Sequence, residues 1–385
     1  MTDPWLDSAS RLAAMACGLF LALGLVGCGK TGGGDVIKVG EYASLTGKEA
    51  SFGQMSHHGT ELAIAEVNAR GGVLGKKLKL LTEDNQSKQG ESKTCADKLI
   101  ARDGVVALLG EASSGRSLEA APICQEEKIP MIAPSSTDPK VTATGDYIFR
   151  VCFVSSFQAK VMARFALQTL RLKSVAVLTD VGLPYSVGLA DAFKPAFVAG
   201  GGSILAEQNY TSGGTDFRAQ LTAIKAARPD GIYVPGYYTE AGLICRQAKE
   251  LGINAPIFGG DGWESMKLVE IGGPAVEGTY FSTHFSPRQK TPAAEEFTKK
   301  FTAQYGAEPD SMAALGYDSA MLLADAIRRA GTTDGPKLRD ALAGTKDFAG
   351  ITGNITIDKD RNASKLAVVL TVKGGKFEHL ETINP

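Results

Sequence analysis

Short apolar runs alternate with amphipathic segments along most of the chain. Each run is rich in β-branched residues and ends in turn residues, which is typical of buried strands in a parallel sheet. In the first part of the sequence the runs occupy residues 36–40, 77–82, 105–109, 129–133 and 147–151. The segments between them place apolar residues on one face and predict helices at 54–69, 91–102 and 116–127.

The same alternation begins again after residue 151. Strands are predicted at 174–179, 203–209, 231–234, 256–259 and 278–283. Helices are predicted at 156–170, 185–199, 216–227, 239–251, 264–270, 293–305, 311–330 and 336–343. Two last strands, 353–357 and 366–372, are expected to meet at the charged turn Asp358–Arg361. Two such series predict an α/β protein with two doubly wound parallel-sheet lobes.

Two clusters of small hydroxyl residues follow strands of the first series. They are Ser113 and Ser114 after the third predicted strand, and Ser135, Ser136 and Thr137 after the fourth. The carboxyl ends of strands in open α/β sheets are where ligands bind, and a following helix offers unpaired N–H groups to an anion. A carboxylate-binding site is therefore one hypothesis. Ordinary helix N-caps are the alternative.

Charge and motif content exclude several classes of function. The formal net charge is −1 and both signs are interspersed, which argues against a nucleic-acid partner. The four histidines and the cysteines show no metal-ligand spacing, so no metal site is predicted. The sequence lacks GxGxxG after its first strand and lacks GxxxxGK[ST], so no nucleotide cofactor is expected.

The amino terminus contains an uncharged apolar stretch, Leu12–Gly29, before a Gly-rich spacer. Its length permits a spanning helix, but its glycines and small-residue end favour a secretory signal. Its end, Leu25-Val26-Gly27-Cys28, resembles the bacterial lipobox, in which the cysteine is acylated. We therefore expect residues 1–28 to be a lipoprotein signal peptide, with lipidation at Cys28, and 29–34 to be a spacer. An uncleaved anchor is the alternative.

Export would place the remaining cysteines in an oxidising compartment. Cys95 and Cys124 fall in consecutive predicted helices of one unit, so they are candidates for a disulfide bond. Buried free thiols are the alternative.

Six segments combine in a specific order and spacing. They are GEYASLTGKEASFG, AIAEVNARGGVLGKKLKLLTEDN, ALLGEASSGRS, IPMIAPSSTDPKVT, GYYTEAGLICRQAKELGI and GGDGW. Together they resemble the periplasmic leucine/isoleucine/valine-binding proteins of branched-chain amino-acid ABC importers. The resemblance implies a type I periplasmic binding protein, with two lobes joined by three crossing strands that close like a clamp. It implies a first lobe of 35–151 plus 285–352 and a second of 152–284 plus 353–385.

The resemblance also implies which residues bind an amino acid. Ser114, Ser136 and Thr137 match positions that hold the α-carboxylate. Asp261, where relatives often carry Glu, matches the residue that binds the ammonium group, and Tyr237 matches a tyrosine beside it. Candidates for contacts with the ligand side chain are Phe52, Tyr185, Trp263 and Tyr317. Core packing is the alternative for each of these four.

The sequence therefore predicts a lipid-anchored periplasmic or extracytoplasmic protein, not an enzyme, that captures an aliphatic or similar hydrophobic amino acid. It would deliver this ligand, a branched-chain amino acid in the first instance, to an ABC permease in the inner membrane. A monomer is expected, with no cofactor and no membrane contact besides the anchor. One alternative is a sensory receptor of the same fold that binds an amide or small carboxylate. A hydrolase using Ser113 or Ser114 is disfavoured, because the chain lacks GxSxG.

Overall fold

Two large sheets organise the chain in the computed structural model, which describes residues 36–383. The predicted signal peptide, the spacer and Cys28 lie outside the described residues. Of the helices within 36–383, none is both long enough and apolar enough to cross a membrane.

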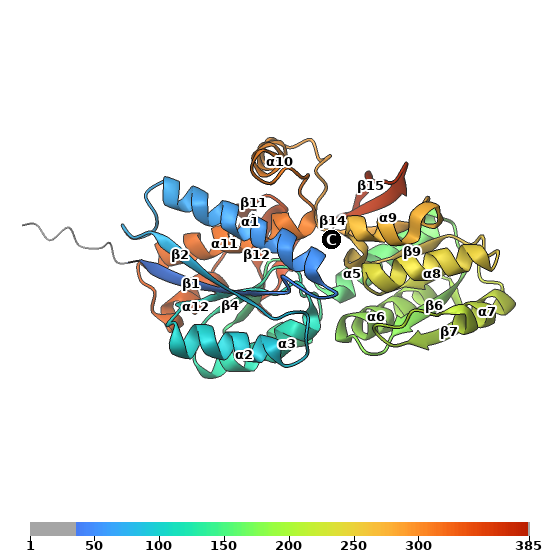
Figure 1. The fold of residues 1–385 in the computed structure, drawn as a ribbon, viewed down its shortest axis with the longest axis horizontal. Helices are drawn as coiled ribbons and strands as arrows, with labels where there is room; N and C mark the ends of the chain where they lie inside the picture. The colour runs from blue at the N-terminus through green and yellow to red at the C-terminus, as the bar shows by residue number, and fades with distance from the viewer. Residues whose placement is uncertain (1–35, 384–385) are drawn as a thin grey trace, which may run out of the picture. The chain divides into compact units, whose positions relative to one another are not determined.

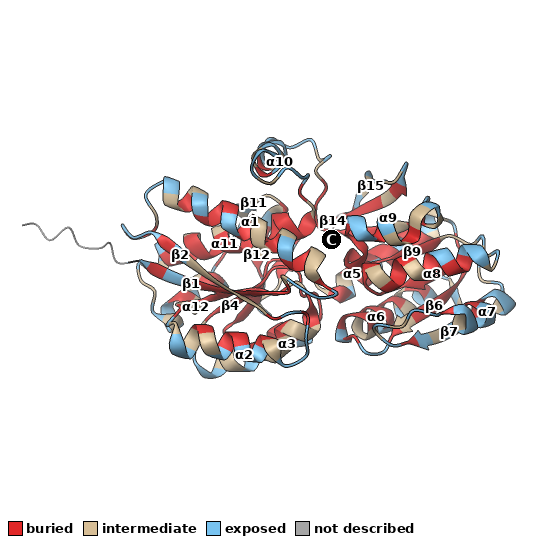
Figure 2. Cartoon of the chain, viewed as in Figure 1, coloured by how far each residue is buried: buried red, intermediate tan, exposed pale blue. Residues whose placement is uncertain are grey.

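The first sheet consists of five parallel strands in the order β2-β1-β3-β4-β5. They are β1 (Ile37–Ala43), β2 (Leu78–Asp84), β3 (Leu108–Leu109), β4 (Met131–Ala133) and β5 (Ile148–Arg150). In Figure 2 the strands are largely buried, while the outer faces of the helices are exposed. Because helices cover both faces of such a sheet, its strands show near-continuous apolar runs in the sequence.

Helices from two distant parts of the chain cover this sheet (Figure 1). The nearer ones are α1 (Ala50–Ala69), α2 (Glu91–Asp97) with its continuation η1 (Lys98–Arg102), α3 (Ser114–Glu126) and α4 (Lys140–Ala143). The distant ones are α11 (Ser311–Ala330) and α12 (Gly335–Ala343), while α10 (Pro292–Tyr305) packs outside them against α1. Since α11 packs along α1, the late helices belong to the same core. We call this assembly the first lobe.

The second sheet has seven strands in the order β15-β14-β10-β9-β8-β6-β7. They are β6 (Ser174–Asp180), β7 (Ser203–Tyr210), β8 (Gly231–Val234), β9 (Ile257–Gly259), β10 (Tyr280–Thr283), β14 (Ala367–Lys373) and β15 (Lys376–Ile383). The first five are parallel, whereas β14 and β15 are antiparallel to their neighbours. The sequence pattern did not predict β15, because this edge strand is mostly exposed and polar.

The helices of the second sheet form its two outer layers, and with the sheet they make the second lobe. They are α5 (Ser155–Arg164) with η2 (Phe165–Thr169), α6 (Pro184–Ala199), α7 (Arg218–Ala227), α8 (Tyr238–Glu250), η3 (Asp261–Trp263), α9 (Met266–Gly272) and η4 (Gly273–Val276). The chain passes between the two hydrophobic cores three times. The crossings lie between Cys152 and Phe153, between Phe281 and Phe285, and between Ala363 and Ala367.

The segment after residue 347 differs from the prediction. A small antiparallel sheet pairs β12 (Gly353–Ile357) with β11 (Phe348–Gly350) and β13 (Ala363–Ser364). The predicted charged turn therefore joins β12 to β13 and not to β14. The reason is that Ile355 and Ile357, two residues apart on one strand face, both pack into the core of the first lobe. The lobe boundaries inferred from the resemblance stay a proposal, with 353–364 better placed in the first lobe.

The predicted disulfide between Cys95 and Cys124 does not form. Both thiols are free within the described chain, and both are buried in an apolar cluster with Leu99 and Ala121. Burial raises the pKa of Cys95 to about 11 and raises that of Cys124 further, so both stay protonated and inert. Each thiol is thus a small apolar group in the core, which was the alternative reading.

Candidate ligand-binding site

The carboxylate of Glu111 holds the loop between β3 and α3 in place. Its Oε1 accepts a hydrogen bond from Ser44 N at 2.9 Å, and its Oε2 accepts one from Ser113 N at 2.9 Å. The side chain is buried, and burial raises the pKa of Glu111. These bonds fix the first turn of α3 at the carboxyl edge of the first sheet, where the hydroxyl cluster lies.

Two of the predicted hydroxyl residues use their side chains within the first lobe. Ser114 Oγ accepts a hydrogen bond from Asp138 N at 3.2 Å. Ser136 Oγ donates to the backbone oxygen of Glu111 at 2.8 Å and lies 2.7 Å from Ser117 Oγ. These bonds join the two hydroxyl loops to each other. The side chain of Ser136 is therefore a structural link and is not free for a ligand.

Thr137 is the hydroxyl residue whose side chain remains available. It is fully buried, and its Oγ1 has no hydrogen-bond partner among residues 36–383. A buried hydroxyl without a partner costs about 1–3 kcal/mol. Such a group marks the point at which a polar ligand atom would complete the structure.

Asp261, in η3 directly after β9, lies at the centre of a buried hydrogen-bond network. Asp261 is buried, with an exposed fraction of 2%. Asp261 Oδ1 accepts hydrogen bonds from Gln158 Nε2 at 2.7 Å and from Tyr185 OH at 2.8 Å. Oδ2 lies 3.1 Å from His284 Nε2 and 3.5 Å from Ser135 Oγ. Because Ser135 belongs to the first lobe, the Asp261 carboxylate meets the hydroxyl loops across the two lobes.

Each donor that the described residues supply to Asp261 is neutral. Burial raises the pKa of Tyr185 far above its usual value, so it remains a phenol. Burial lowers the pKa of His284, and its Nδ1 has no partner within the described chain, which fits the neutral tautomer protonated at Nε2. A buried carboxylate is normally paired with a cation. The carboxylate oxygens of Asp261 accept hydrogen bonds, but no cationic side chain among the described residues forms an ion pair with them.

The two glycines around Asp261 are required by close contacts. A Cβ on Gly260 would lie 2.5 Å from Tyr185 OH, and one on Gly262 would lie 2.7 Å from Cδ1 of Tyr237. Side chains at these positions would push both tyrosines away from the carboxylate. The GGDGW motif therefore lets Tyr185 and Tyr237 approach the backbone on the two sides of Asp261.

Aromatic side chains surround this polar centre and join the lobes. The ring of Phe52, on α1, packs edge-on against Tyr237 and Tyr238 with centroids 5.3 and 4.9 Å apart. Tyr185 packs against Tyr237 at 5.2 Å. Tyr237 also donates a hydrogen bond from its hydroxyl to Ser113 Oγ at 3.0 Å, across the lobes. Three predicted site residues, Phe52, Tyr185 and Tyr237, thus meet in one place.

Trp263 and Tyr317, the other aromatic candidates, lie in the two cores. Trp263 is fully buried, and its Nε1 donates to the backbone oxygen of Val234 at 3.0 Å. Tyr317 packs on Phe297 with centroids 5.1 Å apart. Burial and the neighbouring carboxylate of Glu66 raise the pKa of Tyr317. Both residues fit the core-packing alternative better than a contact with the ligand.

Sequence reasoning missed two residues that hold Asp261, namely Gln158 and His284. A signal existed for His284, since it directly follows a predicted strand and so lies at the carboxyl edge of the sheet. No such signal marked Gln158, which lies within the first turns of α5. Its contact with Asp261 depends on how α5 packs against the sheet.

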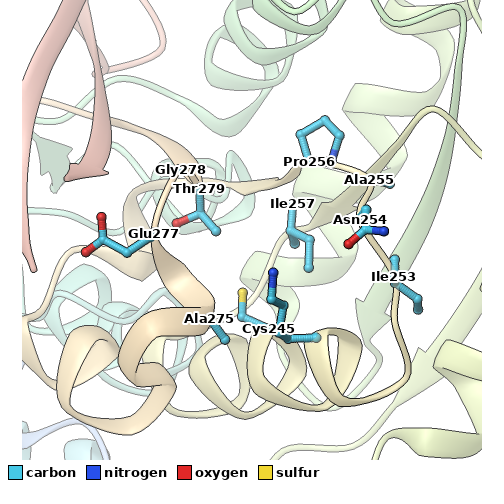
Figure 3. Close-up of a pocket in the computed structure, with 11 residues that line it drawn as sticks. Cys245, Ile253, Asn254, Ala255, Pro256, Ile257, Ala275, Glu277, Gly278 and Thr279 are labelled. Carbon is cyan, nitrogen blue, oxygen red and sulfur yellow. The ribbon is translucent and has the colours of Figure 1, made fainter. Parts of the chain in front are cut away.

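A separate cavity of about 250 Å³ lies at the opposite edge of the second sheet (Figure 3). Its lining includes Ile257 and Thr279, at the amino ends of β9 and β10, and the buried Cys245 of α8. Asp261 follows the carboxyl end of β9 instead. Ligands of open α/β sheets bind at the carboxyl ends, so this cavity is distinct from the candidate site.

The fold and the site at the lobe interface define a class of protein. Residues 36–376 match the Periplasmic binding protein family, and the chain belongs to that family. Members of this class bind solutes and do not catalyse reactions, so the protein is not an enzyme.

Particular relatives agree in fold over nearly the whole described chain. The leucine-binding protein LivK of Thermotoga maritima has a TM-score of 0.88 and 40% identity, covering 91% of this chain and 99% of its own. LivJ of Streptococcus pneumoniae, solved in complex with isoleucine, has a TM-score of 0.87 and 35% identity, covering 91% and 100%. The Leu/Ile/Val-binding protein homolog 2 of Brucella abortus is 33% identical over 96% of this chain and 99% of the relative. The two-lobed type I fold is thereby confirmed.

Proposed function

We propose that this protein captures a free aliphatic or similar hydrophobic α-amino acid between its lobes and delivers it to an ABC importer. Two observations together carry the proposal. The buried carboxylate of Asp261 has no cationic partner among the described residues, and the loop that reaches it through Ser135 also carries the unpartnered hydroxyl of Thr137. An α-amino acid has an ammonium group and a carboxylate on one carbon. It therefore offers a cation to Asp261 in the second lobe and an anion to the hydroxyl loops of the first lobe. We call these two sides the walls of the site.

The energy available at the two walls is sufficient for tight binding. A hydrogen bond to a charged group contributes about 1.5–3 kcal/mol. Three or four such bonds at Ser114, Thr137, Tyr237 and Asp261 would supply much of the about 8 kcal/mol that a micromolar complex needs. We propose these four residues as the polar part of the site.

The aromatic residues around the site favour an apolar ligand side chain. Phe52, Tyr185 and Tyr237 present ring surfaces, which bind hydrophobic groups well. The names of the relatives, leucine-binding and Leu/Ile/Val-binding, support branched-chain amino acids as the first ligands to test.

Closure of the two lobes would couple capture to delivery. Hydrogen bonds already link the lobes, from Tyr237 OH to Ser113 Oγ, from Tyr238 OH to Lys48 O and between Ser51 Oγ and Ser265 Oγ. A ligand that contacts both lobes only when they are shut stabilises that state by its differential affinity. The closed, loaded form is the one that a permease would select.

Lipid anchoring through Cys28 and a periplasmic or extracytoplasmic location are further parts of the proposal. They depend on the lipobox-like end of the amino-terminal apolar stretch. Mass spectrometry of the protein purified from its native membrane tests them, because lipid attachment at Cys28 adds the lipid mass and cleavage of the Gly27–Cys28 bond by a signal peptidase removes residues 1–27. An unmodified chain that begins at Met1 would contradict this part alone.

Titration calorimetry with each free amino acid tests the ligand class. We expect heat with leucine, isoleucine or valine, and little with aspartate or lysine. Benzoate and aliphatic amides belong in the same panel, because a sensory receptor of this fold could bind such ligands. Binding of benzoate or an amide without binding of any amino acid would contradict the proposed ligand class.

A further inference from the structure

Arg150, the last residue of β5, is a buried cation without a carboxylate partner. Its exposed fraction is 0%, which is rare for arginine unless an ion pair forms. Within residues 36–383 its nitrogens donate to uncharged oxygens, and the other side chain at hydrogen-bond distance is the thiol of Cys152, which is neutral because burial raises its pKa to about 11. Asp138 and Asp358 act on it only from farther away, and burial lowers the pKa of its guanidinium.

The guanidinium binds the loop that carries Thr137. Arg150 Nη1 donates to the backbone oxygen of Ser136, and Nη2 donates to the backbone oxygen of Asp138 at 2.8 Å and to Thr142 Oγ1 at 3.2 Å. The two carbonyl groups on either side of Thr137 are therefore both turned toward Arg150.

This orientation determines the direction of one backbone donor. The C=O of Ser136 and the N–H of Thr137 belong to the same trans peptide and point in opposite directions. With the oxygen held by Arg150, the N–H points to the other side of the loop. A positive charge behind the carbonyl also polarises the peptide, which strengthens the N–H as a donor to an anion.

We propose that Arg150 is a positioning residue for ligand binding, which orients the Ser136–Thr137 peptide and supplies positive charge to the wall that receives the ligand carboxylate. The inference rests on the proposed function and adds to it a residue that does not touch the ligand. The two walls then carry opposite buried charges, Arg150 behind one and Asp261 on the other. An amino acid zwitterion matches both, and its carboxylate supplies the anion that Arg150 lacks.

Two substitutions separate charge from hydrogen bonding at this position. Arg150→Gln keeps an amide donor for the Ser136 carbonyl but removes the charge, whereas Arg150→Lys keeps the charge. With L-leucine, L-isoleucine and L-valine as probes, we expect Arg150→Gln to weaken binding by about tenfold or more, as loss of a charge-assisted interaction does. Arg150→Lys should recover most of that loss. Equal affinity of Arg150→Gln and wild type would overturn the proposal, and so would equal losses in both variants.

A second readout does not depend on how the variants fold. In wild-type protein the amide proton of Thr137 should move downfield in the NMR spectrum when L-leucine binds, because the N–H then donates to a carboxylate. An unchanged Thr137 resonance in the bound state would contradict the proposal. If wild type binds none of the three amino acids, the proposed function fails, and the inference fails with it. If wild type binds and the Arg150 variants behave alike, only the inference fails.

Discussion

The imidazole Nε2 of His284 lies 3.1 Å from Oδ2 of Asp261. His284 lies in the second crossing between the lobes, and its ring stacks on Phe153 of the first crossing with centroids 3.7 Å apart. The residue proposed to bind the ammonium group is thus attached directly to the segments about which the lobes would rotate. A ligand cation at Asp261 would act on the crossings through one hydrogen bond.

Replacing Asp261 by Asn should abolish amino-acid binding without unfolding the protein. The amide oxygen can still accept from Gln158 and Tyr185, and His284 can change tautomer to accept from the amide nitrogen. Only the negative charge is lost. Truncating one partner of a buried charge pair costs about 2–5 kcal/mol, which calorimetry would record as a loss of 30-fold or more. Wild-type affinity in Asp261→Asn would remove Asp261 from the ammonium role.

Binding should also weaken as the pH falls through the range below the usual imidazole pKa of about 6.5. Burial lowers the pKa of His284 in the folded protein, so the residue is neutral at pH 7 and gains a proton only in more acid solution. The imidazolium would pair with Asp261 and neutralise the charge meant for the ligand. The free energy of unfolding should also fall as the pH falls through this range, because the unfolded chain binds a proton at His284 more readily than the folded chain does.

The control for this pH dependence is His284→Gln, which keeps a neutral N–H donor. Its leucine affinity should change less between pH 7.5 and 5 than that of wild type. Other groups near His284 change their charge little in that range. Lys365, with a pKa lowered to about 8 by burial, is protonated over most of it, and the pKa of Cys152 is raised to about 11. The same pH profile in both proteins would contradict the role given to His284.

Thr137 and Ser136 should respond oppositely to removal of their hydroxyl groups. Thr137→Val removes a hydroxyl that has no hydrogen-bond partner among the described residues, so thermal stability should be unchanged or higher while leucine affinity falls by about 1.5–3 kcal/mol. Ser136→Ala breaks the bonds to Glu111 and Ser117 and should lower the free energy of unfolding by about 1 kcal/mol. Unchanged leucine affinity in Thr137→Val would remove the Thr137 hydroxyl from the proposed binding site.

Tyr237→Phe should weaken ligand binding modestly. It removes the hydrogen bond to Ser113 across the lobes but keeps the ring that packs on Phe52. We expect a loss of about 0.5–1.5 kcal/mol, the usual net value of a neutral hydrogen bond. Tyr305→Phe is the matched control, because its hydroxyl donates to the backbone of His58 within the first lobe. Equal effects of both variants on affinity would argue against a role for Tyr237 in closure.

Much of the secondary structure could be predicted from the sequence, because buried parallel strands and amphipathic helices leave distinct periodic patterns. The order of strands in the sheets could not be predicted this way. Whether β12 pairs with β13 or with β14 depends on which of the two cores receives Ile355 and Ile357. The alternation of apolar and polar residues in the β12 sequence is compatible with either pairing. Edge strands such as β15 carry too few apolar residues to be recognised.

For the site, residue type and position at a strand end marked the hydroxyl cluster that contains Thr137, whereas Tyr237 and Asp261 were predicted from the family resemblance. The pattern could not show that Ser136 turns its hydroxyl inward, since that depends on the backbone path between two loops. It also could not show Arg150, a charged residue inside a predicted strand. Its importance follows only from the absence of an ion-pair partner among the described residues, which is a property of the folded chain.

The central claim is that the two walls together recognise a zwitterion, and three ligands of similar shape test it most directly. They are L-leucine, isopentylamine, which lacks the carboxylate, and 4-methylpentanoate, which lacks the ammonium group. Titration calorimetry of the wild-type protein should show leucine binding at least about 100-fold more tightly than either of the others, because each lacks charge-assisted bonds to one wall. Binding of 4-methylpentanoate as tightly as leucine, or no heat with leucine, would contradict the account.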